Sequence, residues 1–134
     1  MGKRVRIGMV GTGFSAQFHL ASYRKVYGED FEIAGIHGRN MARVAELADR
    51  FGIPARYDTI DAMLRDPGID AVDLCVPNHL HVPLILRAAD HGKHVICEKP
   101  LGGYFGPADA GEDWTAAGAP RAAMLDHVVA EVRA

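Results

Sequence analysis

The stretch "GMVGTGFSA", residues 8–16, decides the fold that this sequence predicts. It places Gly11, Gly13 and Ala16 in the spacing G-x-G-x-x-G/A, after an apolar run and before a stretch of helical character. In this spacing the first glycine permits a tight turn, the second leaves room for a pyrophosphate, and the alanine allows close packing of helix on strand. The stretch therefore predicts a dinucleotide-binding turn; a plain strand-to-helix turn with chance glycines is the alternative.

The sequence around this turn alternates between strand and helix signals, a pattern typical of a parallel sheet with crossover helices. The expected strands are residues 4–10, 31–36, 56–57, 71–76 and 94–97. The expected helices are residues 15–27, 41–51, 60–65 and 82–89, with glycines at positions 28, 52 and 92 suited to their C-terminal ends. We predict an α/β fold with a doubly wound parallel sheet, the Rossmann dinucleotide-binding fold.

The expected helix at residues 41–51 shows the helical period clearly. Asn40 is placed to cap its N-terminus, and apolar residues recur every three or four positions. These are Met41, Val44, Ala45, Ala48 and Phe51. The spacing predicts that one face of this helix packs on the sheet.

The pattern changes after residue 100. Residues 101–119 are rich in glycine, alanine and acidic residues without a sustained period, which predicts a long surface loop. Residues 120–134 form the last expected helix, with Pro120 in its first turn. Its apolar stripe is Leu125, Val128, Val129 and Val132. Because the stripe still runs at Ala134, we expect this helix to be truncated, through a longer natural protein or a missing element that would cover it.

Composition favours one globular domain over residues 1–134, since the chain is 49% hydrophobic and 24% charged. The formal net charge of −2 and the lack of a long basic cluster argue against a nucleic-acid partner. No apolar run has the pattern of a signal peptide or the length of a membrane span. Cys75 and Cys97 fall inside apolar runs, so we expect two buried thiols rather than a disulfide, and a cytoplasmic location.

The end of the second expected strand bears on which cofactor binds. An acidic residue there would accept hydrogen bonds from the ribose of NAD, but residues 36–40 read "IHGRN". Arg39, between Gly38 and Asn40, offers a guanidinium where the 2′-phosphate of NADP would lie. This favours NADP over NAD, unless Arg39 is a solvated residue at the entry of the following helix.

The stretch "VPNHLH", residues 76–81, follows the fourth expected strand at its carboxyl end. Asn78 can donate and accept hydrogen bonds toward a cofactor ribose or amide. His79 and His81 are spaced so that they could both bind a metal ion. The other histidines are scattered along the chain, however, and we expect no bound metal. His81 is either a cofactor-side residue or a helix-start residue bonded to backbone.

The stretch "CEKP", residues 97–100, ends the fifth expected strand at the same edge of the sheet. Lys99 there, close to a nicotinamide, is suited to exchange a proton with a substrate hydroxyl. Pro100 would fix the backbone that aims this lysine. The alternative is that Glu98 and Lys99 only solvate the strand end.

With these motifs identified, the chain resembles the N-terminal half of the Gfo/Idh/MocA family, the glucose-fructose oxidoreductase and inositol dehydrogenase-like enzymes. The resemblance spans residues 5–106 and rests on "VGTGFSAQFH", "VAELADRFGIP", "DAVDLCVPNHLH" and "HGKHVICEKPL" in the family's order. It implies an NAD(P)-dependent oxidoreductase that transfers a hydride between the nicotinamide and a hydroxyl or carbonyl carbon of a sugar or cyclitol. It further implies that Lys99 is the catalytic residue and that His19 is a recurrent histidine of the first helix.

The residues expected to contact the cofactor come from the glycine turn, the second strand end, and the two later stretches. They are Gly11, Thr12, Gly13, Phe14, Ser15, Gly38, Arg39, Asn40, Pro77, Asn78, His81, Glu98, Lys99 and Pro100.

Two features depart from the family pattern. Asp73 stands where an apolar strand residue is usual, and it has no evident role unless it reaches the edge of the strand. The resemblance further implies a second domain, which supplies the substrate pocket, a catalytic histidine and much of the dimer interface, and we expect none of it in these 134 residues. We therefore expect this chain alone to bind dinucleotide without turnover, and an uncovered sheet edge or helix face would favour a homo-oligomer.

Two other functions compete with this hypothesis. A stand-alone dinucleotide-binding or redox-sensing module would lack a substrate domain, but it should end in a capped or polar helix. A methyltransferase with a similar glycine turn would not require the lysine-proline pair. The substrate itself cannot be predicted from this chain.

Overall fold

The computed structural model describes residues 2, 4–103 and 121–134. Its centre is a five-stranded sheet whose neighbouring strands are all parallel. The strands are β1 (Val5–Val10), β2 (Phe31–His37), β3 (Ala55–Tyr57), β4 (Ala71–Leu74) and β5 (His94–Cys97). Their order, β3-β2-β1-β4-β5, is that of a doubly wound sheet, so the predicted fold class is confirmed.

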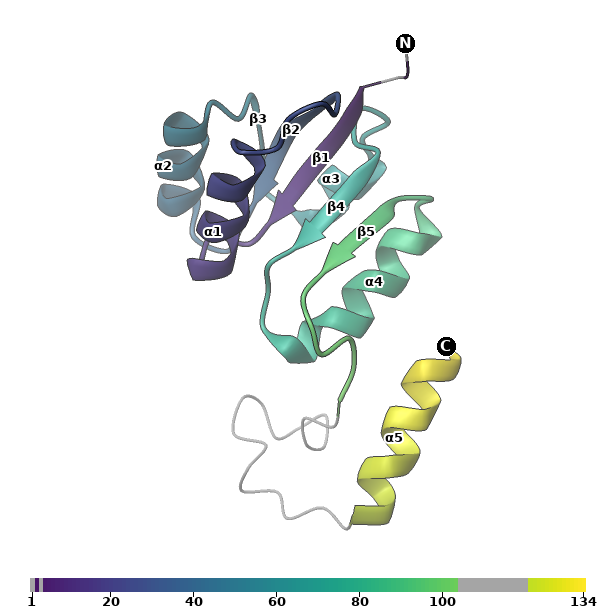
Figure 1. The fold of residues 1–134 in the computed structure, drawn as a ribbon. Coiled ribbons are helices and arrows are strands. Elements are labelled where there is room, and N and C mark those ends of the chain that lie inside the picture. The colour runs from purple at the N-terminus through teal and green to yellow at the C-terminus, as the bar shows by residue number, and fades with distance from the viewer. Residues whose placement is uncertain (1, 3, 104–120) are drawn as a thin grey trace.

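Helices cover both faces of the sheet (Figure 1). The covering helices are α1 (Phe14–Tyr23), α2 (Met41–Phe51), α3 (Ile60–Arg65) and α4 (His81–Asp90). The chain also forms the short 3-10 helix η1 (Asn78–Leu80) before α4, and α5 (Arg121–Arg133), which lies apart from the sheet in Figure 1. One face packs against α1 and α2, and the other packs against α3 and α4. Met9 packs in the core on the side of α1 and α2, and Val10 packs in the core on the side of α3 and α4, because successive side chains of a strand point to opposite faces.

The helix α2 begins and ends as predicted. The side-chain oxygen of Asn40 accepts hydrogen bonds from the backbone N–H groups of residues 42 and 43, at 3.0 and 3.2 Å, and Gly52 has a left-handed φ of 69°. Val44 and Ala48 are buried as expected, but Met41 is 41% exposed. The buried face instead includes Leu47, which the periodicity analysis left out.

The helix α1 ends at Tyr23, earlier than the predicted residue 27. After Tyr23, the backbone N–H groups of Lys25 and Val26 donate hydrogen bonds to the carbonyl oxygens three residues earlier, at 2.9 and 3.2 Å. These turn bonds replace the α-helical bonds to the residue four positions earlier. Gly28 has a positive φ of 86°, but it lies in the turn toward β2 rather than at the helix end. The early end leaves the ring of Tyr23 packed against Phe31, with 5.4 Å between ring centroids.

The fourth predicted strand also ends earlier than expected. β4 stops at Leu74 rather than at residue 76, because Leu74 is the last residue paired with both β1 and β5 before the chain turns into η1. The predicted loop at residues 101–119 lies mostly outside the described residues, as does Pro120. α5 occupies the place of the predicted last helix, and its Val129 and Val132 are exposed.

The two cysteines were predicted to be buried thiols rather than a disulfide. Cys75 and Cys97 are free thiols, as predicted, but both are half-buried rather than buried. Within residues 2, 4–103 and 121–134, none of the helices combines the length and the apolar character that crossing a membrane would need.

Candidate functional site

A cavity of about 850 Å³ lies at the edge of the sheet where β1, β2 and β4 end. In open α/β sheets this carboxyl edge is where ligands bind. Many of the residues expected to contact a cofactor line it, namely Gly11, Thr12, Gly13, Phe14, Ser15, Gly38, Arg39, Asn40 and Pro77. The fold therefore brings the glycine turn, the end of β2 and the loop after β4 around one space.

The two glycines of the turn have different roles. Gly11 has a φ of 117°, and a Cβ atom built on it would lie 2.1 Å from the carbonyl oxygen of Cys75. Gly13 has an extended backbone, and a Cβ atom there would meet nothing within 4 Å. The fold thus requires glycine at position 11, whereas Gly13 borders open space in the cavity.

The N-terminus of α1 faces the same cavity through Phe14 and Ser15. Gly13 is its N-cap residue, no side chain caps the helix, and no acidic residue lies in its first turn. The first N–H groups of a helix have no helical partner and lie at the positive end of the helix dipole. They can therefore bind an anion such as a phosphate.

We expect Gly11→Ala to lower the free energy of unfolding by about 2–4 kcal/mol, since alanine is strained at this φ and its methyl group would collide with a carbonyl. Gly28→Ala is the matched control, because Gly28 also has a positive φ but open space around its Cα. It should cost about 1–2 kcal/mol. Urea unfolding followed by circular dichroism measures both, and equal losses would contradict the packing argument.

The end of β2 forms the next part of the cavity wall. Gly38 packs so closely that a Cβ atom on it would lie 2.6 Å from the methyl carbon of Thr12. Arg39 is exposed at the cavity, whereas the side-chain oxygen of Asn40 is engaged in capping α2. Of this group, Arg39 has the charged side chain that can reach a bound anion.

The remaining expected residues do not line the cavity. They are Asn78, His81, Glu98, Lys99 and Pro100, on the segments that follow β4 and β5. His81 is 1% exposed, with its Nδ1 2.7 Å from the carbonyl oxygen of Pro100 and its Nε2 3.2 Å from that of Val76. Its ring ties the two segments together, which fits the alternative interpretation of His81 as a helix-start residue bonded to backbone.

Asp73, which had no evident role in the sequence, lies in a hydrogen-bond network beneath α1. Its side chain is fully buried, and its Oδ2 accepts a hydrogen bond from the Tyr23 hydroxyl at 2.8 Å. The same oxygen lies 2.8 Å from Nδ1 of His19, whose Nε2 lies 3.0 Å from Oε1 of Glu98. The network therefore runs from the interior of the sheet to the segment that carries Lys99.

The environment shifts the pKa values of this network. Burial lowers the pKa of His19, but its hydrogen bonds with Asp73 and Glu98 outweigh this and raise it above 6.5. The hydrogen bond from His19 lowers the pKa of Glu98. Burial, reinforced by Asp73, raises the pKa of Tyr23 and of Cys75, so both groups remain protonated at neutral pH.

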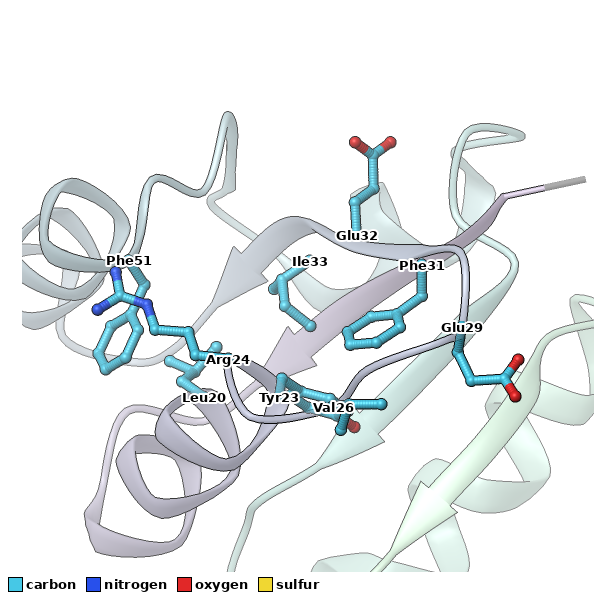
Figure 2. A pocket seen from close by; sticks show the side chains of 9 residues that line it. All are labelled: Leu20, Tyr23, Arg24, Val26, Glu29, Phe31, Glu32, Ile33 and Phe51. Atoms are coloured by element: carbon cyan, nitrogen blue, oxygen red, sulfur yellow. The ribbon is translucent and has the colours of Figure 1, made fainter.

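A smaller hollow of about 300 Å³ lies at the amino end of β2, away from the carboxyl edge. Figure 2 shows Tyr23 next to Phe31 on one side, with their rings tilted by 56°, and Arg24 beside Phe51 on the other. The Arg24 guanidinium carbon lies 4.6 Å from the centre of the Phe51 ring. We assign no ligand to this hollow, since its groups pack against one another.

Comparison with known proteins identifies the relatives of this domain. The profile of the family described as an oxidoreductase family with an NAD-binding Rossmann fold matches residues 5–118. The chain belongs to the Gfo/Idh/MocA family. The resemblance predicted from the four motifs is confirmed.

Individual Gfo/Idh/MocA relatives agree with this assignment. An uncharacterized oxidoreductase of Rhizobium meliloti, ORF334, is 43% identical over 97 residues, which are 72% of this chain and 29% of that protein. KijD10, a 3-ketoreductase from Actinomadura kijaniata solved with NADP and TDP-benzene, has a TM-score of 0.68 and 31% identity over 75% of this chain and 30% of that one. Levoglucosan dehydrogenase, solved with NADH and levoglucosan, has a TM-score of 0.69 and 33% identity over 75% and 29%. The chain thus spans less than a third of the length of these relatives.

Several residues of this Gfo/Idh/MocA domain line the cavity although they were not among the expected cofactor contacts. They are Val10, His37, Ile60, Cys75, Val76, Leu80, Leu84 and Arg87. Ile60 could have been found, because it begins α3 just after the carboxyl end of β3. Arg87 carried no such signal, since it lies inside α4 and reaches the cavity through the packing of that helix.

His19, Asp73 and Cys75 are residue types that can also bind metal ions, and their nitrogen, oxygen and sulfur atoms lie within 4.8 Å of one another. In this Gfo/Idh/MocA domain those atoms already contact each other, with the Cys75 Sγ 3.4 Å from His19 Nδ1 and 3.6 Å from Asp73 Oδ1. The raised pKa of Cys75 disfavours the thiolate that a metal requires. We interpret the cluster as a hydrogen-bond network.

Proposed function

We propose that the cavity binds NADP and that this chain is the cofactor domain of a dehydrogenase. The observation that carries the proposal is the glycine turn, where open space at Gly13 adjoins the uncapped N-terminus of α1. A pyrophosphate in that space would accept hydrogen bonds from the first backbone N–H groups of the helix. Similarity to proteins solved with NADP and with NADH supports this class of ligand.

The proposed fit places the two halves of the dinucleotide at different parts of the edge. Arg39, with Gly38 behind it, would face the ribose that carries the 2′-phosphate. Pro77, which lines the cavity on the segment after β4, would face the half that carries the nicotinamide, and Asn78 is the next residue of that segment. The bound nicotinamide would supply a hydride acceptor or donor.

The proposed reaction moves a hydride between the nicotinamide and a hydroxyl or carbonyl carbon of a sugar- or cyclitol-like substrate. The names of relatives support this substrate class, among them levoglucosan dehydrogenase. Lys99 would take a proton from the substrate hydroxyl during oxidation and return it during reduction. Since the chain spans 29% of the ORF334 relative, the substrate pocket is expected to come from residues beyond it.

Isothermal titration tests the cofactor preference. We expect this chain to bind NADPH more tightly than NADH, because the Arg39 guanidinium can form charge-assisted hydrogen bonds with the 2′-phosphate. Arg39→Ala should weaken NADPH binding by about 10- to 100-fold, the equivalent of one such bond, and leave NADH binding nearly unchanged.

Arg43→Ala is the matched control for Arg39→Ala. Arg43 is an exposed arginine in the first turn of α2, paired with Glu46 at 2.8 Å, and it does not line the cavity. Its replacement should leave the NADPH affinity unchanged. Equal binding of the two cofactors by the unaltered chain would contradict the role of Arg39.

We also propose a cytoplasmic location for the protein. The support is the pair of free thiols, Cys75 and Cys97, which a reducing compartment preserves. Cell fractionation with an antibody against this domain tests the location.

A further inference from the structure

His19 lies between two carboxylates from different parts of the sheet. Its Nδ1 is 2.8 Å from Asp73 Oδ2, and its Nε2 is 3.0 Å from Glu98 Oε1. A carboxylate can only accept hydrogen bonds, and a neutral imidazole has one donor. When both carboxyl groups are ionised, both contacts are hydrogen bonds only if both ring nitrogens carry a proton, so this geometry fits a cationic His19 that bridges the two side chains.

The two ends of this bridge differ in burial. Asp73 has 0% of its side chain exposed and is also held by the Tyr23 hydroxyl at 2.8 Å. Glu98 has 49% of its side chain exposed, on the segment that follows β5. His19, at 16% exposure, therefore connects a fixed point inside the domain to a residue at its surface.

A second histidine holds the other side of the same segment. His81 is buried, and its Nδ1 lies 2.7 Å from the carbonyl oxygen of Pro100. Lys99 stands between Glu98 and Pro100 and is exposed. The backbone of Lys99 is thus flanked on each side by a residue that a histidine from another element holds.

We propose that His19 is a positioning residue for Lys99: in its protonated form it ties Glu98 to buried Asp73, and on losing a proton it releases the segment that carries Lys99. Glu98 can keep its contact only while Nε2 of His19 is a donor, since Nδ1 is turned toward Asp73. The consequence for turnover rests on the function proposed above for Lys99.

The direction of the pH effect follows from the groups that face His19. These are Asp73 on β4, Cys75 after β4 and Glu98 after β5, while Tyr23 on α1 donates to the same oxygen of Asp73 that His19 contacts. The two carboxylates raise the pKa of His19 above 6.5. The bridge is therefore formed below that raised pKa, as long as Glu98 stays ionised, and it is lost as the pH rises through the pKa of His19.

NMR titration of the 134-residue chain tests the bridge without cofactor or substrate. The imidazole nitrogens of His19 and the backbone amides of Glu98 and Lys99 should shift with one common midpoint, above 6.5. Glu98→Gln should move the His19 midpoint to lower pH, since it removes one of the two charges. A His19 midpoint at or below 6.5, or amide signals that do not follow it, would overturn the proposal.

Two substitutions of His19 separate positioning from support of the fold. His19→Asn can place an amide near Nδ1 and keep the Asp73 contact, whereas His19→Gln can place one near Nε2 and keep the Glu98 contact. In a full-length protein carrying this domain, we expect His19→Asn to lower kcat by about 10- to 100-fold, with little change in KM. In the unaltered protein, release of the segment should lower kcat as the pH rises through the pKa of His19. His19→Gln should lower kcat less and should not show this fall, because its amide does not titrate. Equal losses with unchanged pH profiles would show that His19 only supports the fold.

The NMR titration tests the bridge, and the turnover of Lys99→Ala tests the proposed function, so each can be contradicted without the other. A common NMR midpoint combined with normal turnover of Lys99→Ala would contradict the proposed function but uphold the bridge. Separate midpoints combined with a large loss of turnover in Lys99→Ala would uphold the proposed function and overturn the bridge.

Discussion

Replacing Lys99 with alanine in a full-length protein that carries this domain is expected to lower kcat by about 100- to 10,000-fold, the contribution of a well-placed group that exchanges a proton with substrate. Lys99 is exposed at the end of β5 and does not line the cavity proposed for the dinucleotide. Cofactor affinity should therefore change little. Steady-state kinetics, with NADPH titration of the same protein, measures the two effects separately.

Two further lysine substitutions define what Lys99 contributes. Lys99→Arg keeps a positive charge, but a guanidinium does not give up its proton in this pH range, so turnover should remain low. Lys25→Ala, at an exposed lysine in the turn after α1, should keep normal turnover. Full activity of Lys99→Arg would mean that only the positive charge at this position matters. Intact turnover of Lys99→Ala would contradict the proposed catalytic role of Lys99.

Gly13→Val is expected to weaken dinucleotide binding by at least about 100-fold while the domain stays folded. Its side chain would enter the open space in front of α1 and displace the pyrophosphate from the helix N–H groups. Losing two charge-assisted hydrogen bonds, each worth about 1.5–3 kcal/mol, accounts for this magnitude. Isothermal titration gives the affinity, and thermal unfolding gives the stability.

The reciprocal control is Gly52→Ala at the C-terminal end of α2. Gly52 has a φ of 69° and does not line the cavity, so this variant should lose stability and keep its affinity for the dinucleotide. Gly13→Val is expected to do the opposite, losing affinity and keeping stability, because the backbone at Gly13 is extended and other residues can adopt it. Normal NADPH affinity in Gly13→Val would contradict the proposed phosphate site.

Local patterns predicted the fold well because each depends on neighbours in the chain. The glycine turn, the Asn40 cap and the left-handed Gly52 all appear where the sequence predicts them. The end of α1 was predicted wrongly, because the apolar residues Val26 and Tyr27 extend the helical period beyond Tyr23. Packing of Tyr23 against Phe31, a contact made across the turn, accompanies the earlier end.

The candidate site was only partly predictable. Residues that follow a strand directly, such as Gly13 and Arg39, could be placed at the carboxyl edge from the strand pattern alone. Arg87 could not, because its approach to the cavity depends on how α4 packs across the sheet. His81 shows both cases, since its place at the start of α4 is local while its contact with Pro100 joins two separate strand ends.

By itself, the sequence determined the alternating strands and helices, the glycine turn and the family, because these depend on residue spacing along one chain. Only the tertiary structure decided the role of Asp73. His19 contacts both Asp73 and Glu98, which lie 54 and 79 residues further along the chain. Parallel pairing of β1, β4 and β5 places them under one helix. A buried carboxylate needs such donors, and no local pattern records which distant residues will supply them.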